Sequence, residues 1–120
     1  MIVVDTKGVK LEEAKNDPMV GVGPVFRKLL VDGKISKGYS MAIVKYDKGS
    51  KLKWHTHDSE QIIIGTDGKG ILATKEQEHI VTPGVVVVVP AGEVHYHGAA
   101  PGKSFTHIAF YSGSSQVLDK

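Results

Sequence analysis

Short strand-like segments, each followed by a turn, fill the chain from residue 25 to residue 112. The turns are rich in Gly, Asp and Pro, and the whole chain contains 14 Gly and 5 Pro. Segments of this length between frequent turns favour a sandwich or a barrel over alternating β-α units. The predicted strands are 25–31, 39–46, 51–57, 59–65, 70–76, 78–82, 85–89, 93–99 and 104–112. The sequence therefore predicts an all-β fold.

The chain length predicts one domain. A chain of 120 residues is an ordinary domain and can bury enough surface to fold without disulfides. No repeat or linker divides the sequence, so we expect a single domain over residues 1–120. Its parts are an N-terminal arm with short strands (1–38), a barrel (39–112) and a tail (113–120).

Several segments carry local expectations of their own. Residues 9–18 favour one or two helical turns that end at a proline. The run 85–89 is all valine, which predicts a strand with both faces covered. The tail 113–120 is expected to fray. Met41 and Ile43 are candidates for inward apolar walls, with a register that the sequence leaves open by one residue.

Charge and cysteine content exclude several classes of protein. The net charge is +2, and Arg27 is the one arginine among 15 scattered basic residues. This pattern is typical of a solvated surface and argues against a nucleic-acid partner. Without cysteines there is no disulfide framework, thiolate zinc site or cysteine nucleophile. The longest apolar run, 85–89, is too short to cross a bilayer, so we expect a soluble cytoplasmic protein without a membrane partner.

Two His-x-His pairs lie on separate predicted strands. They are His55 with His57 and His95 with His97, in a chain of six histidines. Alternate residues of a strand share a face, so both members of each pair point to the same side. Two such pairs are hard to explain as polar strand faces and indicate a metal site. His79 lies in a polar hairpin and is expected to be exposed.

The glycine and proline spacing around these pairs resembles the two sequence motifs of the cupin family. The first motif reads Gly49, His55, His57, Gln61 and Gly68, and the second reads Gly84, Pro90, Gly92 and His95. The resemblance is specific over residues 49–98 and implies a jelly-roll barrel, that is, a double-stranded β-helix. It also implies that both motifs supply ligands to one metal inside the barrel.

The third ligand of the first motif is either Glu60 or Gln61. In an unbroken strand Gln61 shares the face of His55 and His57, whereas Glu60 points away. The family spacing also falls on position 61, although the usual family residue there is Glu. A bulge at 58–60 would instead turn Glu60 inward. We therefore expect Gln61 as the ligand, which leaves a dication site with its full +2 charge and makes the ion a stronger Lewis acid.

The C-terminal part of the barrel carries two further histidines. The stretch 95–110 resembles a cupin subgroup that includes manganese-dependent hydroxynitrile lyases. The resemblance implies that His55, His57, Gln61 and His95 bind the metal, while His97 and His107 line the substrate pocket as catalytic residues. The remaining alternatives for His97 are a further ligand or a structural role. By strand parity Trp54 faces away from the ligands and is expected to pack outside the pocket.

These expectations define three candidate functions. The first is a lyase or isomerase that acts on a small oxygenated compound, with one divalent transition metal (Mn, Fe, Co, Ni or Zn, with Mn favoured by the resemblance). A metal-dependent dioxygenase and a non-enzymatic cupin that binds a metal or a small molecule are the alternatives. The resemblance also implies a homodimer, to which residues 1–30 could contribute strands.

Overall fold

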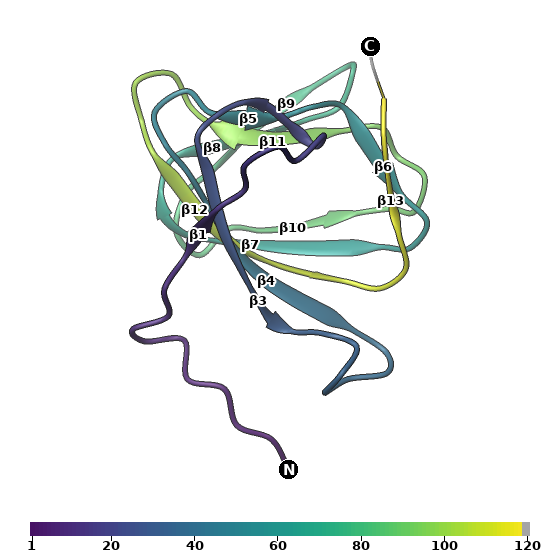
Figure 1. The fold of residues 1–120 in the computed structure, drawn as a ribbon. Helices are drawn as coiled ribbons and strands as arrows, with labels where there is room; N and C mark the ends of the chain where they lie inside the picture. Colours follow the sequence, from purple (N-terminus) through teal and green to yellow (C-terminus); the bar gives the residue numbers. More distant parts are fainter. Residues whose placement is uncertain (119–120) are drawn as a thin grey trace.

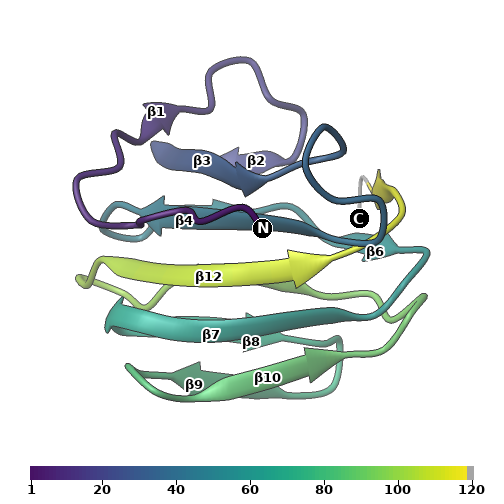
Figure 2. The ribbon, with the colours of Figure 1, turned by 90° about the horizontal axis from the view of Figure 1, so that it is seen from below.

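The computed structural model describes residues 1–118, and within them all regular structure is β-strand. One sheet has the order β1-β3-β4-β12-β7-β10 and a second has the order β2-β5-β11-β8-β9. A short pair, β13 with β6, lies at one end of the molecule (Figure 1). All strand pairs are antiparallel, and the two large sheets face each other (Figure 2). The predicted all-β jelly-roll fold is confirmed.

Most strand bounds lie within three residues of those predicted, but the predicted strand 51–57 is two strands, β5 and β6, which belong to different sheets. The larger sheet contains β1 (Glu12–Glu13), β3 (Val25–Val31), β4 (Ser40–Tyr46), β12 (Phe105–Tyr111), β7 (Gln61–Gly68) and β10 (Val86–Val89). The smaller sheet contains β2 (Val20–Val22), β5 (Lys51–Leu52), β11 (Tyr96–Ala99), β8 (Gly70–Ala73) and β9 (Glu78–Val81). The end pair consists of β6 (His55–His57) and β13 (Ser115–Val117).

The core fills one part of the space between the sheets. Tyr46 and Phe105 stack there with ring centroids 5.9 Å apart, and Ile63 and Val81 are fully buried beside them. Gly70 lets β8 pass close to this core, because a Cβ at that position would overlap the Phe105 ring. The rest of the space between the sheets is a cavity lined by both polar and apolar side chains.

Two local predictions about the chain ends are wrong. Residues 9–18 form no helix, because Glu12 and Glu13 pair with β3 and the Ala14 N–H donates to the Val25 carbonyl (2.8 Å). Pairing with a strand far along the chain thus overrides a weak local helical preference. The tail does not simply fray, since Ser115–Val117 pairs with β6. Residues 119 and 120 of the predicted tail lie outside the described residues.

Two predictions about strand faces are also wrong. The valine run was expected to be covered on both sides, but β10 is an edge strand, and Val86 and Val88 are each 56% exposed. In β4 the inward residues include Ala42 and Tyr46, both buried. Met41 therefore belongs to the outer face, one residue off the expected register. Within residues 1–118, no helix is long and apolar enough to cross a membrane.

Candidate metal centre

A cavity of about 290 Å³ occupies the space between the sheets next to the apolar core. Its walls include Leu29, Ala42, Val44 and Ala109, which come from three neighbouring strands of the larger sheet. The polar residues that line it include His55, His57, Gln61, His97, His107 and Ser115. The strands thus bring together, around one small enclosed volume, residues that lie far apart in the sequence.

Four histidines form the centre of this site. The ligand nitrogens of His55, His57, His95 and His97 all lie within 4.8 Å of one another, and all four residues are buried. This spacing is comparable with the width of a coordination shell in which each metal–nitrogen bond is about 2.0–2.1 Å. His55 and His95 also form a backbone bridge, which joins the two motifs directly. Four buried imidazoles in this arrangement could bind a divalent metal.

The Nδ1 atoms of three of these histidines are held by the cavity wall. The His55 Nδ1–H donates to the Lys53 carbonyl (2.7 Å), and the His95 Nδ1–H donates to the Glu93 carbonyl (2.9 Å). His57 Nδ1 shares a hydrogen bond with Ser115 Oγ at 2.7 Å. Such contacts fix the ring orientation and the tautomer of ligating histidines in metal sites. His55 and His95 therefore turn an Nε2 lone pair inward, and His57 turns its Nε2 atom to the same side.

The ring nitrogens that face the cavity lack suitable hydrogen-bond partners. His57 Nε2 and His97 Nε2 are buried and have none among the described residues. His95 Nε2 lies 3.3 Å from Gln61 Oε1. With the proton of His95 on Nδ1, both of these atoms are acceptors, so they do not bond to each other. Unsatisfied acceptors that face one another are unfavourable alone and are satisfied by a shared cation, so the residues present fit a metal ion.

The choice between Glu60 and Gln61 follows strand parity. Gln61 begins β7, points into the cavity and is only 4% exposed. Glu60 is exposed to solvent. Strand β7 thus has no bulge that would bring the carboxylate inside, and the cavity contains an amide oxygen where a carboxylate is usual.

The two histidines expected to line the substrate pocket form a separate buried network with a tyrosine. Tyr46 Oη lies 2.9 Å from His107 Nε2 and 3.4 Å from His97 Nδ1, and the two nitrogens are 3.4 Å apart. His97 connects the two groups, because it also belongs to the four-histidine cluster. His107 lies beyond His97 and outside the four-histidine cluster, with its ring centroid 5.2 Å from that of His97.

Sequence reasoning missed Tyr46 and Ser115. The sequence places Tyr46 on a predicted strand. It leaves the register of that strand open by one residue, so it does not tell whether Tyr46 points inward. Ser115 gave no signal, since its role depends on the tail pairing with β6. His79 and Trp54 are as predicted, because His79 is exposed and Trp54 lies on the outer side of the smaller sheet.

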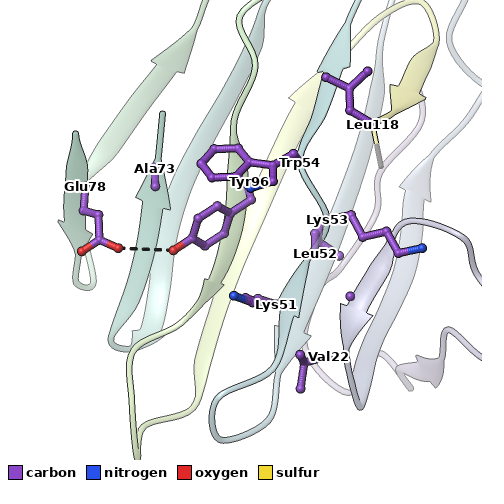
Figure 3. A pocket seen from close by; sticks show the side chains of 10 residues that line it. Val22, Lys51, Leu52, Lys53, Trp54, Ala73, Glu78, Tyr96 and Leu118 are labelled. Atoms are coloured by element: carbon purple, nitrogen blue, oxygen red, sulfur yellow. Dashed lines mark hydrogen bonds between the residues drawn. The ribbon is translucent and has the colours of Figure 1, made fainter. Parts of the chain in front are cut away.

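Trp54 lines a second and larger hollow, of about 640 Å³, on the outside of the barrel (Figure 3). Trp54 and Tyr96 pack edge to face there with centroids 4.9 Å apart, and the Tyr96 hydroxyl donates to Glu78 (3.3 Å). The ammonium of Lys75 lies 3.9 Å from the Trp54 ring centroid. No histidine lines this hollow, so the smaller inner cavity is the candidate site despite its size.

Burial keeps the inner histidines neutral. It lowers the pKa of His55 and of His57 to about 4, and that of His107 to about 3. Burial lowers the pKa of His97 well below its ordinary value, and the neighbouring His107 adds to this effect. Neutral imidazoles are the form that binds metals and accepts protons. Burial also raises the pKa of Tyr46, whose hydroxyl therefore stays protonated.

The family model of the cupin domain matches residues 42–108, more than half of the chain. The chain belongs to the cupin family. The matched region contains both His-x-His pairs, Gln61 and His107, so the six predicted site residues all come from the part that defines this cupin.

Two curated proteins similar to this cupin are named as lyases. An (R)-mandelonitrile lyase from Granulicella tundricola is 41% identical over 70 residues, which cover 57% of this chain and 53% of the relative. The chain thus matches about half the length of that relative. The dimethylsulfoniopropionate lyase DddW from Ruegeria pomeroyi is 26% identical over 115 residues, covering 89% of this chain and 75% of that protein.

Solved structures confirm the fold. A cupin-like protein from Thermotoga maritima superposes with a TM-score of 0.85 and 28% identity, covering 95% of this cupin and 89% of that chain. The polyketide cyclase RemF from Streptomyces resistomycificus gives a TM-score of 0.83 at 18% identity, over 100% of this cupin and 87% of that chain.

The metal-free protein should lose stability in acid. A histidine whose folded pKa lies below its unfolded value stabilises the fold fully above pH 6.5, and this contribution falls as the pH decreases toward about 4. For His55 alone the loss is about 3 kcal/mol. Urea unfolding of the metal-free protein across this pH range should show the decrease. His55→Asn should make the dependence shallower, whereas His79→Asn should leave it unchanged, and equal slopes in all three proteins would contradict the prediction.

Proposed function

We propose that this cupin is a metal-dependent lyase that cleaves a small oxygenated compound of the cyanohydrin type. The observation that carries the proposal is the set of unsatisfied acceptors, two imidazole Nε2 atoms and the facing pair of His95 and Gln61, around one buried point. A small cavity of about 290 Å³ beside them suits a small substrate.

The proposed metal ligands are His55, His57, Gln61 and His95, with manganese as the favoured ion among divalent transition metals. A bound dication would supply Lewis acidity that polarises a substrate hydroxyl or carbonyl. None of these four side chains carries a negative charge, so the site would keep the full charge of the ion for an oxyanion of the substrate. This charge balance supports proton transfer and bond cleavage rather than oxidation.

His97 is proposed as the base, with His107 as its partner. The three proposed histidine ligands have Nδ1 held by a carbonyl or a serine hydroxyl, whereas His97 Nδ1 faces Tyr46 and His107, which can relay a proton. In cyanohydrin cleavage His97 would accept the hydroxyl proton at Nε2. The bond to the nitrile carbon then breaks, a carbonyl forms, and the leaving cyanide takes the proton back from His97.

The two lyase-named relatives support this reaction class over a dioxygenase or a pure binding role. The first is named for mandelonitrile, a cyanohydrin, and its matched stretch is the more similar of the two. The matched stretch covers about half of that protein, so the substrate assignment to this cupin is a proposal.

Manganese-loaded protein should release benzaldehyde from mandelonitrile. Because general acid–base catalysis contributes roughly a hundredfold or more, His97→Ala should lower the rate by at least that factor. His79→Ala, an exposed histidine, is the matched control and should keep the rate. The assay follows benzaldehyde absorbance, and a wild-type rate no higher than that of His97→Ala would refute the cyanohydrin reaction.

Metal content should depend on Gln61 and not on Glu60. Removal of a ligand oxygen lowers metal affinity, so Gln61→Ala should bind manganese roughly tenfold more weakly. Glu60→Ala removes a carboxylate from the outside and should bind normally. Metal analysis after equilibrium dialysis measures both variants, and loss of metal in the Glu60 variant alone would show that the carboxylate is the ligand.

We also propose that the protein is a homodimer joined through the outer face of the larger sheet. Ile62 lies between Val88 and Phe110 in register across β10, β7 and β12, and all three are exposed. A contiguous exposed apolar face of this kind favours association.

Light scattering should therefore give twice the chain mass of 12.9 kDa. Val88→Lys places a charge in the proposed contact and should shift the protein toward the monomer. Ile35→Lys changes an exposed apolar residue elsewhere and should not. A wild-type mass of 12.9 kDa would refute the dimer.

A further inference from the structure

Arg27, the single arginine of the chain, lines the same cavity as the histidines. It lies on β3 with its side chain 55% exposed, whereas His97 and His107 are at most 2% exposed. The cavity therefore has an exposed end at Arg27 and a buried end at the histidine network. Leu29, Ala42 and Val44 add an apolar wall to the same cavity.

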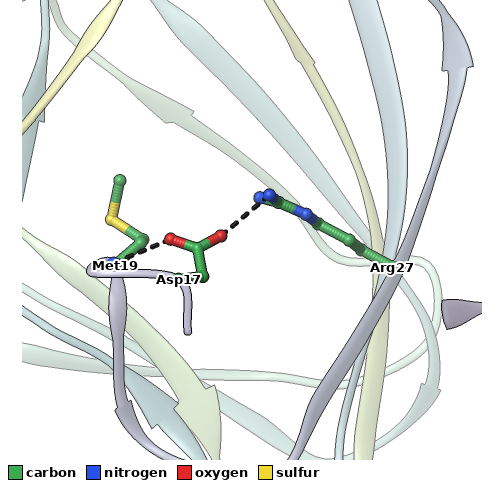
Figure 4. Close-up of polar contacts among 3 residues, drawn as sticks. All are labelled: Asp17, Met19 and Arg27. Atoms are coloured by element: carbon green, nitrogen blue, oxygen red, sulfur yellow. Dashed lines mark hydrogen bonds and ion pairs between the residues drawn. The ribbon is translucent and has the colours of Figure 1, made fainter. Parts of the chain in front are cut away.

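Arg27 is held in this position by the loop before β2. Asp17 Oδ2 lies 2.8 Å from an Arg27 guanidinium nitrogen, and Asp17 Oδ1 accepts the Met19 N–H (2.8 Å). Figure 4 shows both contacts, with the guanidinium reaching toward the loop from the opposite strand. A guanidinium has five N–H donors, so one contact with a carboxylate leaves most of them free for another acceptor.

The lining of the cavity has no negative charge. Among the described residues that line it, Arg27 alone carries a full charge, and none is Asp or Glu. The positive charge also reaches inward, because it lowers the pKa of the buried Tyr46 against the larger effect of burial. A ligand that enters at this end thus meets the Arg27 guanidinium, with one nitrogen held by Asp17, and then neutral polar atoms at the buried end.

We infer that Arg27 is a specificity-determining residue that binds a carboxylate at the far end of the substrate. The substrate class is small hydroxy- or oxo-compounds, cyanohydrins included, that also carry a carboxylate, with the hydroxyl or carbonyl at the histidines and the carboxylate at Arg27. Arginine suits this role, since its planar fork matches a carboxylate with two parallel hydrogen bonds. The inference deepens the proposed lyase function, and it rests on the same cavity as the substrate site.

The alternative is that Arg27 only fastens the loop through Asp17. This ion pair is half-buried, because the Asp17 side chain is 15% exposed and the Arg27 side chain 55%. The two roles differ in what they predict. A fastening role lowers thermal stability in a variant, whereas a recognition role lowers the affinity for carboxylates selectively.

The test is calorimetric titration of metal-loaded protein with β-hydroxypropionate, γ-hydroxybutyrate and δ-hydroxyvalerate, each beside its neutral amide. The series covers different distances between the hydroxyl and the carboxylate. Arg27→Gln should weaken the tightest carboxylate by roughly tenfold or more and leave its amide nearly unchanged. Lys28→Gln is the matched control, because it removes the same charge one residue away on the opposite face of β3.

Three results would overturn the inference. They are equal losses of carboxylate affinity in the Arg27 and Lys28 variants, equal losses for carboxylate and amide, and no carboxylate that binds tighter than its amide. Binding is measured without turnover, so the two proposals can fail separately. Arg27-dependent binding without benzaldehyde release would refute the cyanohydrin reaction and support the carboxylate site. Benzaldehyde release without Arg27-dependent binding would support the reaction and refute the carboxylate site.

Discussion

The burial of five neutral imidazoles in one small space is the constraint on which the rest of this structure depends. A buried polar group without a hydrogen bond costs free energy, so each ring must be satisfied by the wall around it. Lys53, Glu93 and Ser115 provide acceptors for the Nδ1 side of three rings. The opposite side of those rings then faces the cavity with a free lone pair. The same contacts that make burial tolerable thus create a metal-binding surface.

The charges in and around the cavity follow a consistent pattern. The amide of Gln61 lies where the family usually has a carboxylate, and Arg27 adds a positive group at the exposed end. In the proposed substrate complex, a metal ion at the histidines and the Arg27 guanidinium would together select the length of the substrate as well as its charge.

The two faces of the larger sheet serve different purposes. Inward residues of β4, β7 and β12 supply the wall and the polar network, as with Tyr46, Gln61 and His107. Outward residues of the same strands, such as Ile62 and Phe110, form an exposed apolar surface. Strand alternation makes this division automatic, because neighbouring residues point to opposite sides. Changes at the outer face therefore leave the lining of the site untouched.

The sequence by itself determined the strands, the all-β class and the inward set of His55, His57, Gln61, His95 and His97. These depend on turn residues and on a period of two, which are local properties of the chain. Tyr46, Ser115 and Arg27 emerged only from the tertiary structure. Their roles depend on the register of β4, on the pairing of the tail with β6 and on the loop before β2. Such pairings join residues that are distant in sequence, and a shift of one residue turns every side chain of a strand to the other face.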